Sequence, residues 1–250
     1  MYIFFIGHGS SKLAAISEFL YIVDLFKIFH PRIKVGCWLL EFGKVQLTDS
    51  FKPLSGISLI IPIMLLNSKH IKYDICVICN YLQLKFKVDI ILIIGICSNI
   101  LNTKLVCNLI KQKLLSYQNK ININTNMLVL VYRGGSDISA NALSHLIGRL
   151  IWEGTGFVWC EIAFIGITFP LIKFTSNVRS MSSKFIVPFL LFYGELYCNL
   201  SDNCKGDILT NYIFNDITSV LAFYRRIRIS LNDLGFSGCN FCKYRLLYSL

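Results

Sequence analysis

Two of the four histidines in this chain follow stretches that predict β-strands. His8 lies in the turn GHGSS after the apolar stretch YIFFI, and His70 follows SLIIPIM through the loop LLNSK. Glu41 ends a third such stretch, KVGCWLL. Because the carboxyl ends of parallel strands meet at one edge of a sheet, we expect these three side chains to converge there. Two imidazoles and a carboxylate suit a borderline divalent metal, and the carboxylate is also able to accept protons.

Each of these residues also has a plainer interpretation. A histidine after a strand is often structural, and Glu41 alternatively caps the helical stretch that follows it. The other two histidines, His30 and His145, fall within or at the ends of predicted helices, and we interpret both as structural. The prediction of a metal site therefore depends on the convergence of His8 and His70, since neither residue is specific alone.

Hydrophobic periodicity predicts strands that alternate with helices along the whole chain. Such alternation is typical of βαβ units and parallel sheets, so the predicted fold class is α/β. We expect strands at 2–6, 33–40, 57–64, 88–94, 127–132, 158–166 and 184–191, and helices at 11–29, 45–52, 70–84, 138–151, 168–180 and 215–232.

The chain contains an internal repeat. IFFIGHGSS at 3–11 returns as VLVYRGGSD at 129–137, which sets Arg133 opposite His8 at a spacing of 125 residues. Pro62 in LIIPIMLL and Pro188 in FIVPFLLF are 126 residues apart. We expect two similar domains related by duplication, at 1–120 and 125–250, the first carrying the metal ligands and the second a degenerate copy. The polar segment SYQNKININTN at 116–126 is the expected boundary.

Composition raises the possibility of a membrane protein, because 54% of the residues are hydrophobic. The longest uncharged windows, 53–68 and 90–103, are shorter than the roughly 20 residues of a spanning helix and fit buried strands better. The N-terminus has no basic segment before its apolar stretch and does not resemble a signal peptide. We therefore expect a cytoplasmic protein that is not inserted in a membrane.

The net charge of +11 is spread along the chain without a dense basic patch. Nucleic acid is therefore not the expected partner, and a small polyanionic substrate fits better. Biased base composition would produce the same excess. The ten cysteines are scattered through apolar stretches, which favours reduced thiols over disulfides. Cys76 and Cys79 form a CxxC on a predicted amphipathic helix and are interpreted as core residues.

Several motifs resemble the sirohydrochlorin cobaltochelatases of cobalamin biosynthesis. They are GHGSS at 7–11, LLEF at 39–42, IIPIMLLNSKHIKYDI at 60–75, RGGSDISAN at 133–141, LIWEGTGF at 150–157, IAFIGITFPL at 162–171 and CNFCKYR at 239–245. The last is typical of the long form of that family. The resemblance implies a class II chelatase fold, with two similar α/β halves and the tetrapyrrole between them, and an enzyme that inserts Co2+ into sirohydrochlorin.

The resemblance also implies roles for individual residues. The metal-binding histidines of the family carry over to His8 and His70, with Glu41 beside them. Arginine does not ligate metals at pH 7 but pairs with carboxylates, so Arg133 either holds a propionate or acetate of the macrocycle or is structural. Ser10 and Ser136, in the two glycine turns, are further candidates for binding the tetrapyrrole.

The cysteines at the C-terminus suggest a second metal centre. Cys239 and Cys242 form a CxxC that the resemblance associates with an iron–sulfur cluster, and thiolates also suit zinc. Cys198 and Cys204 lie upstream at an irregular spacing. Three alternatives remain open at this point: insertion of iron or nickel by the same fold, a non-catalytic carrier of metal or tetrapyrrole, and a membrane-associated remnant without activity.

Overall fold

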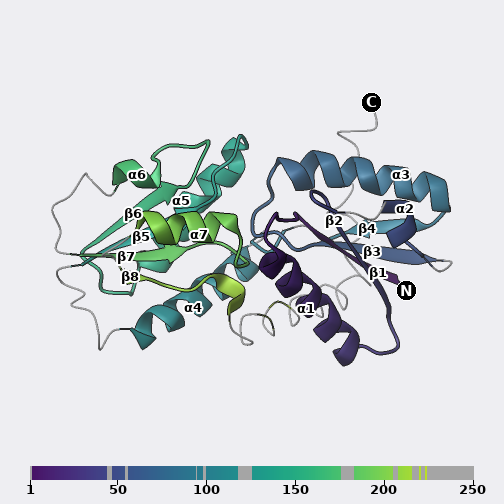
Figure 1. The fold of residues 1–250 in the computed structure, drawn as a ribbon, viewed down its shortest axis with the longest axis horizontal. Coiled ribbons are helices and arrows are strands. Elements are labelled where there is room, and N and C mark those ends of the chain that lie inside the picture. The colour runs from purple at the N-terminus through teal and green to yellow at the C-terminus, as the bar shows by residue number, and fades with distance from the viewer. Residues whose placement is uncertain are drawn as a thin grey trace. The chain divides into compact units, whose positions relative to one another are not determined.

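The computed structural model describes residues 2–43, 47–53, 56–93, 95–97, 100–117, 126–175, 183–204, 208–215, 220 and 223. Contacts divide these residues into two compact units (Figure 1). Unit 1 contains the described residues up to Cys97 together with Val220 and Phe223, and unit 2 contains those from Ile100 to Asn215.

Unit 1 is built on a four-stranded parallel sheet in the order β2-β1-β3-β4. The central position of β1 explains its sequence, because all six residues of YIFFIG are buried and both of its faces are covered. The elements are β1 (Tyr2–Gly7), α1 (Leu13–Phe29), β2 (Lys34–Leu39), α2 (Leu47–Ser50), β3 (Ile57–Pro62), the π-helix η1 (His70–Ile75), α3 (Cys76–Phe86) and β4 (Asp89–Leu92).

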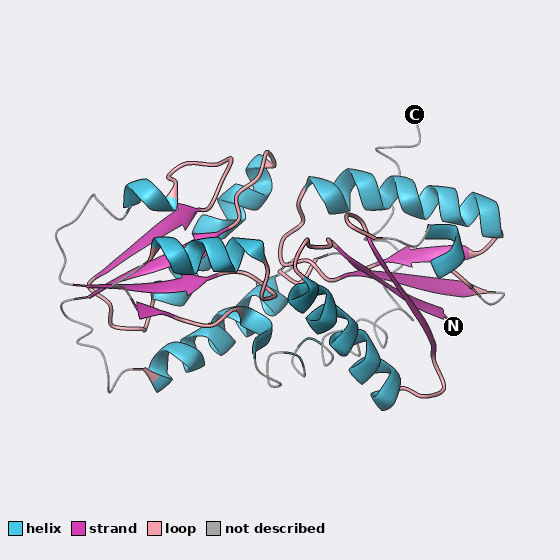
Figure 2. Cartoon of the chain, in the orientation of Figure 1, coloured by secondary structure: helices cyan, strands magenta, loops and turns pink. Residues whose placement is uncertain are grey.

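Alternate residues of β1 pack into two aromatic cores, because successive side chains of a strand point to opposite faces. Phe5 meets Phe26 of α1 edge-on, with ring centroids 5.2 Å apart. Phe4 points to the other face and meets Phe51 at 5.1 Å, in the cluster that contains α3 residues such as Leu82. Figure 2 shows α1 and α3 covering opposite faces of this sheet, which fixes the tips of β1, β2 and β3 in place.

Unit 2 repeats the design with a parallel sheet in the order β6-β5-β7-β8. Gly148 lets α5 approach the sheet closely, because a Cβ there would collide with Ile162 of β6. The elements are α4 (Ile100–Ser116), β5 (Asn126–Tyr132), α5 (Ile138–Trp152), β6 (Trp159–Phe164), α6 (Ile172–Thr175), β7 (Ser183–Pro188), α7 (Glu195–Asn203), β8 (Ile208–Leu209) and the 3₁₀-helix η3 (Ile213–Asn215).

The two sheets have the same topology, which confirms the prediction of two similar parallel α/β domains. The register of the strands also agrees: Pro62 pairs with Ile6 across β1 and β3, and Pro188 pairs with Val131 across β5 and β7. The contacts divide the chain before α4, which packs against α5 in unit 2. The domain limits 1–120 and 125–250 stay a prediction.

Most strands and helices begin and end within about two residues of their expected positions. The elements α4, α7 and β8 were not predicted from the sequence. The expected helix at 168–180 is wrong at 168–171, which form a loop, because a residue before a proline such as Pro170 is disfavoured in a helix; α6 covers 172–175 and the rest lies outside the described residues. Most of the expected helix at 215–232 also lies outside them. Within the described part of the chain, no helix is both long and apolar enough to cross a membrane.

Candidate metal site

The tips of β1 and β2 hold His8 and Glu41 side by side. The two strands pair in parallel up to Gly7 and Leu39. Beyond the strands the pairing continues, since the backbone N–H of Leu40 donates to Gly7 O at 3.0 Å and that of Glu41 donates to His8 O at 2.9 Å. The backbone therefore fixes the two residues next to each other before their side chains make any contact.

Gly9 is required by this close approach. Its φ of +96° lies in the left-handed region, and a Cβ there would collide with the carbonyl oxygen of Glu41. The glycine that follows His8 in the GHGSS turn thus allows the loop after β1 to pack directly on the loop after β2.

His70 reaches the same edge from the neighbouring strand β3. It is the first residue of η1, and the loop before it is anchored to the loop after β4, because Gly95 N donates to the side-chain oxygen of Asn67 at 2.8 Å. A second tie is the bond from Ile96 N to Met64 O at 2.8 Å. Short π-helical segments occur often at functional sites.

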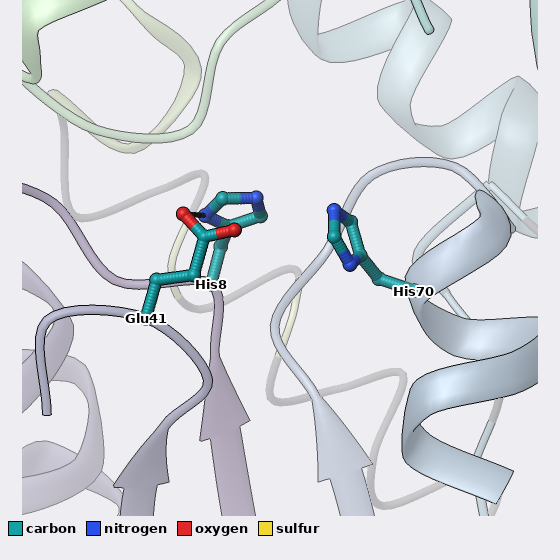
Figure 3. Close-up of side chains that lie close together, drawn as sticks. All are labelled: His8, Glu41 and His70. Carbon is teal, nitrogen blue, oxygen red and sulfur yellow. Dashed lines mark ion pairs between the residues drawn. The ribbon is translucent and has the colours of Figure 1, made fainter. Parts of the chain in front are cut away.

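His8, Glu41 and His70 come together at this edge (Figure 3). His8 Nδ1 lies 3.7 Å from Glu41 Oε2, and the two imidazole rings meet edge to face with centroids 4.9 Å apart. One ligand atom from each of the three residues lies within 4.8 Å of the others. The predicted convergence of these side chains is therefore observed in the structure.

The spacing of the three side chains suits one metal ion after small movements. Ligand atoms about 2.1 Å from a tetrahedral ion lie about 3.4 Å apart, so modest rotations of the side chains would close the group around an ion. The side chains of His8, His70 and Glu41 are 24%, 33% and 46% exposed, which leaves the group open to solvent. Three protein ligands with an open position are typical of a reactive metal site rather than a structural one.

Asp74 is a residue of the site that was not predicted from the sequence. Its Oδ2 lies 2.7 Å from His70 Nδ1, one turn further along the helix. A carboxylate in this position favours the tautomer with the proton on Nδ1, so the other ring nitrogen, Nε2, is left to bind a metal. The spacing of four residues between a histidine and an acid on one predicted helix was the available signal.

Unit 2 repeats the backbone of this edge without its ligands. Gly166 N donates to Arg133 O at 3.1 Å, the same bond that Glu41 N makes to His8 O. Gly134 has a φ of +80°, and a Cβ on it would collide with the carbonyl oxygen of Gly166. Arg133 and Gly166 are therefore the counterparts of His8 and Glu41.

The residue of unit 2 that corresponds to His70 is found by comparing the backbone hydrogen bonds at the start of η1 with those at the start of α7. The residues three and four after Ser68 donate their N–H groups to its carbonyl oxygen, and those three and four after Gly194 do the same. Two residues after Ser68 comes His70, and two residues after Gly194 comes Leu196. In unit 2 the three positions of the site are thus occupied by arginine, glycine and leucine.

The other residues singled out from the sequence lie elsewhere or have local contacts. Ser10 Oγ accepts a hydrogen bond from the N–H of Lys12 at 3.1 Å, while Ser136 is exposed in the second glycine turn. His30 ends α1 against Phe26, with ring centroids 4.5 Å apart, and His145 lies within α5. Neither histidine joins the group.

The cysteines named in the sequence analysis lie in different environments. Cys79 is buried in the core of unit 1, as expected, whereas Cys76 is only partly buried. Cys204 is buried in the core of unit 2. Cys198 lies on α7. Cys239 and Cys242 lie outside the described residues, so the proposed second centre stays a prediction. The metal-ligand group found within the described ranges is that of His8, Glu41 and His70.

Comparisons with known proteins agree with this fold. The CbiX family model matches residues 127–213. A curated relative, sirohydrochlorin cobaltochelatase from Priestia megaterium, is 29% identical over 131 residues, which are 48% of this chain and 43% of the relative. The match thus spans less than half the length of that protein.

Solved structures match nearly the whole chain. SirB from Bacillus subtilis with Fe3+ superposes with a TM-score of 0.79 and 21% identity, covering 94% of this chain and 97% of the other. The sirohydrochlorin chelatase SirB from Bacillus subtilis subspecies spizizenii in complex with cobalt gives 0.73 and 21%, covering 93% and 95%. These matches and the paired parallel sheets show that the chain has the fold of these chelatase structures, and over residues 127–213 its sequence is similar to the CbiX family.

Proposed function

We propose that this protein inserts a divalent metal ion into sirohydrochlorin. The observation that carries the proposal is the convergence of His8, Glu41 and His70 at the carboxyl edge of the first sheet. The names of the matched relatives support the same reaction. In this proposal His8 and His70 hold the incoming metal as neutral imidazoles, and the open side of the group faces the macrocycle.

The reaction releases two protons for each metal ion inserted. The macrocycle loses two pyrrole N–H protons while the metal exchanges its water ligands for ring nitrogens. Glu41 is the proposed proton acceptor, because its carboxylate is almost half exposed and can pass protons on to solvent. Asp74 holds His70 in the orientation that leaves Nε2 toward the metal.

Cobalt is the proposed physiological metal. The curated relative is named a cobaltochelatase, which favours Co2+, whereas the SirB structures were solved with Fe3+ and with cobalt. Imidazole and carboxylate ligands accept several first-row divalent ions, with affinities in the order Fe2+ < Co2+ < Ni2+. Iron and nickel are therefore the alternatives that a rate measurement has to separate.

We further propose that catalysis is asymmetric and belongs to unit 1. The positions equivalent to the ligands carry Arg133, Gly166 and Leu196 in unit 2, and none of these side chains supplies a metal ligand at pH 7. Arg133 is exposed at the edge of its sheet and is proposed to pair with a carboxylate of the macrocycle. The duplicated fold thus separates metal binding from substrate binding.

The test follows the absorbance of sirohydrochlorin in separate reactions with Co2+, Fe2+ and Ni2+. His8→Ala and His70→Ala should slow insertion by orders of magnitude and should weaken the dependence on metal concentration. Arg133→Ala should mainly raise the concentration of sirohydrochlorin needed for half-maximal rate. His145→Ala is the matched control, because this histidine lies on α5 in unit 2 outside the group.

Each alternative has its own outcome in this assay. A carrier would bind metal and tetrapyrrole without raising the rate above that of the uncatalysed reaction. An iron or nickel chelatase would show its highest kcat/KM with that metal. The assignment to unit 1 is wrong if the histidine variants turn over normally while Arg133→Ala loses its response to cobalt.

The C-terminal cysteines are proposed to be dispensable for metal insertion. Cys239 and Cys242 are distant in sequence from the strand tips that carry the ligand group. The double variant Cys239→Ser, Cys242→Ser should keep the initial rate of insertion within about tenfold of wild type, which is about 1.4 kcal/mol of activation free energy. A larger loss in a folded variant would place these thiols in the catalytic apparatus.

A further inference from the structure

The loop after β6, residues 166–170, presents two large apolar side chains to solvent. Ile167 is 74% exposed and Phe169 is 71% exposed. The loop leaves the carboxyl end of a parallel strand, the edge at which ligands bind in α/β sheets. Two exposed apolar side chains so close together in a short loop are a candidate contact surface.

Thr168, between these two residues, ties the loop down. Its Oγ1 accepts a hydrogen bond from Gly135 N at 3.0 Å and donates one to Gly135 O at 2.9 Å. The strand end is fixed as well, because Phe164 N donates to Pro170 O at 2.9 Å. The exposed side chains are therefore held on a fixed backbone, and little conformational entropy remains to be lost when a ligand binds them.

Ile167 adopts a conformation that its side chain disfavours. Its φ is +66°, in the left-handed region, where a β-branched residue is a clear outlier and glycine or asparagine is favoured. Burial does not compensate for this cost, since the side chain is mostly exposed. Backbone strain of this kind is concentrated at functional sites.

The equivalent residue of unit 1 behaves in the same way. Phe42 follows Glu41 as Ile167 follows Gly166, has a φ of +59° and is 63% exposed. Both halves of the duplication thus keep a bulky apolar residue, exposed and in a left-handed conformation, at the position next to the site. In unit 1 that position adjoins a ligand of the candidate metal site.

Arg133 adds a positive charge next to the apolar loop. Its carbonyl oxygen accepts the hydrogen bond from Gly166 N at 3.1 Å, so the two backbones touch, and its side chain is exposed. Two exposed apolar side chains beside a guanidinium fit an apolar ring with carboxylates on its rim. Aliphatic peptides would use the apolar side chains but not the charge.

We propose, on the basis of the proposed function, that the loop 166–170 and Arg133 form a binding surface for the tetrapyrrole. Ile167 and Phe169 contact the face of the macrocycle, and Arg133 pairs with one of its peripheral carboxylates. The strained backbone at Ile167 keeps its side chain directed outward, away from the core of unit 2.

The experiment measures binding of metal-free sirohydrochlorin to the full chain by equilibrium dialysis, together with the thermal unfolding temperature. The variant is Ile167→Asn, which replaces the apolar side chain by one that tolerates a positive φ. We expect affinity to fall about tenfold, equivalent to about 1.4 kcal/mol, while the unfolding temperature stays the same or rises. A merely structural role of Ile167 would not lower affinity in a protein of unchanged stability.

Val158→Asn is the matched control. Val158 is also a β-branched, exposed residue of unit 2, at 54%, but it precedes β6 and lies at the opposite edge of the sheet. The Val158→Asn variant should bind sirohydrochlorin with the affinity of the wild type. Phe169→Ala should weaken binding, and Arg133→Gln should weaken it more at low salt than at high salt.

The outcomes distinguish this proposal from the proposed function. If wild type inserts metal while Ile167→Asn and Phe169→Ala bind sirohydrochlorin with unchanged affinity, the binding surface is wrong and the chelatase function stands. If wild type does not bind metal-free sirohydrochlorin at all, both proposals are overturned. Equal losses in Ile167→Asn and Val158→Asn would also contradict the binding surface.

Discussion

Asp74 offers a sharp test of how the metal is held. The change Asp74→Asn removes a negative charge but keeps the shape of the side chain and a hydrogen-bond acceptor for His70 Nδ1. A role in binding the metal through His70 predicts a loss of metal affinity without a loss of fold. Asp74→Ala, which removes the acceptor as well, should lose more.

The expected magnitude follows from the geometry. Asp74 Oδ2 lies 2.7 Å from Nδ1, and an ion bound to the far nitrogen of the ring would lie about 7 Å from the carboxylate. A divalent ion and a unit charge at about 7 Å attract each other by about 1 kcal/mol in water and about 2 kcal/mol where screening is half as strong. Because the Asp74 side chain is 51% exposed, we expect a tenfold loss of affinity, about 1.4 kcal/mol.

The assay is calorimetric titration of Co2+ into the purified protein at pH 7.5, at low and high salt. Asp24→Asn is the control, because Asp24 is an exposed acid of unit 1 that pairs with Lys27 at 2.8 Å, on α1. The loss in Asp74→Asn should shrink at high salt, since the charges are partly exposed. If Asp74→Asn binds Co2+ within twofold of wild type while His70→Ala has lost binding, Asp74 does not support the metal through His70.

Three further predictions concern stability and thiol reactivity. Gly9→Ala should lower the free energy of unfolding, measured in urea, at least twice as much as Gly56→Ala. Both glycines have a positive φ, but only a Cβ at Gly9 would collide with another residue, Glu41. Phe51→Ala should cost about 3 to 5 kcal/mol in the same assay, since its fully buried ring contacts three other aromatic rings. Burial raises the pKa of Cys160 to about 12, so at pH 8 its thiol stays protonated, and mass spectrometry should find it unmodified by iodoacetamide until the protein is unfolded.

The candidate site could be predicted because it depends on a simple rule. His8, Glu41 and His70 each follow an apolar strand, and parallel strands end at one edge, so their convergence needed no knowledge of side-chain packing. Asp74 was missed although the predicted helix at 70–84 places it four residues after His70, because the prediction followed residues at strand ends and not pairs along a helix.

Other features were missed for different physical reasons. α4 has a helical pattern of buried residues, Val106, Ile110 and Leu114, but its first residues fall in the uncharged window 90–103, which fits a buried strand and concealed that pattern. The left-handed conformations of Phe42 and Ile167 could not be predicted, because residue type predicts such a backbone only for glycine, asparagine or aspartate.

The backbone hydrogen bond from Gly166 to Arg133 has an evolutionary consequence. It shows that the backbone frame of the candidate site is present in unit 2 without the candidate ligands, because main-chain atoms and not imidazoles hold the two loops together. A side chain at Gly166 would find open space, with no atom within 4 Å of its Cβ. The candidate ligand group and its counterpart in unit 2 thus differ in three side chains on the same backbone frame, so point substitutions alone would separate a half that carries the ligands from one that does not.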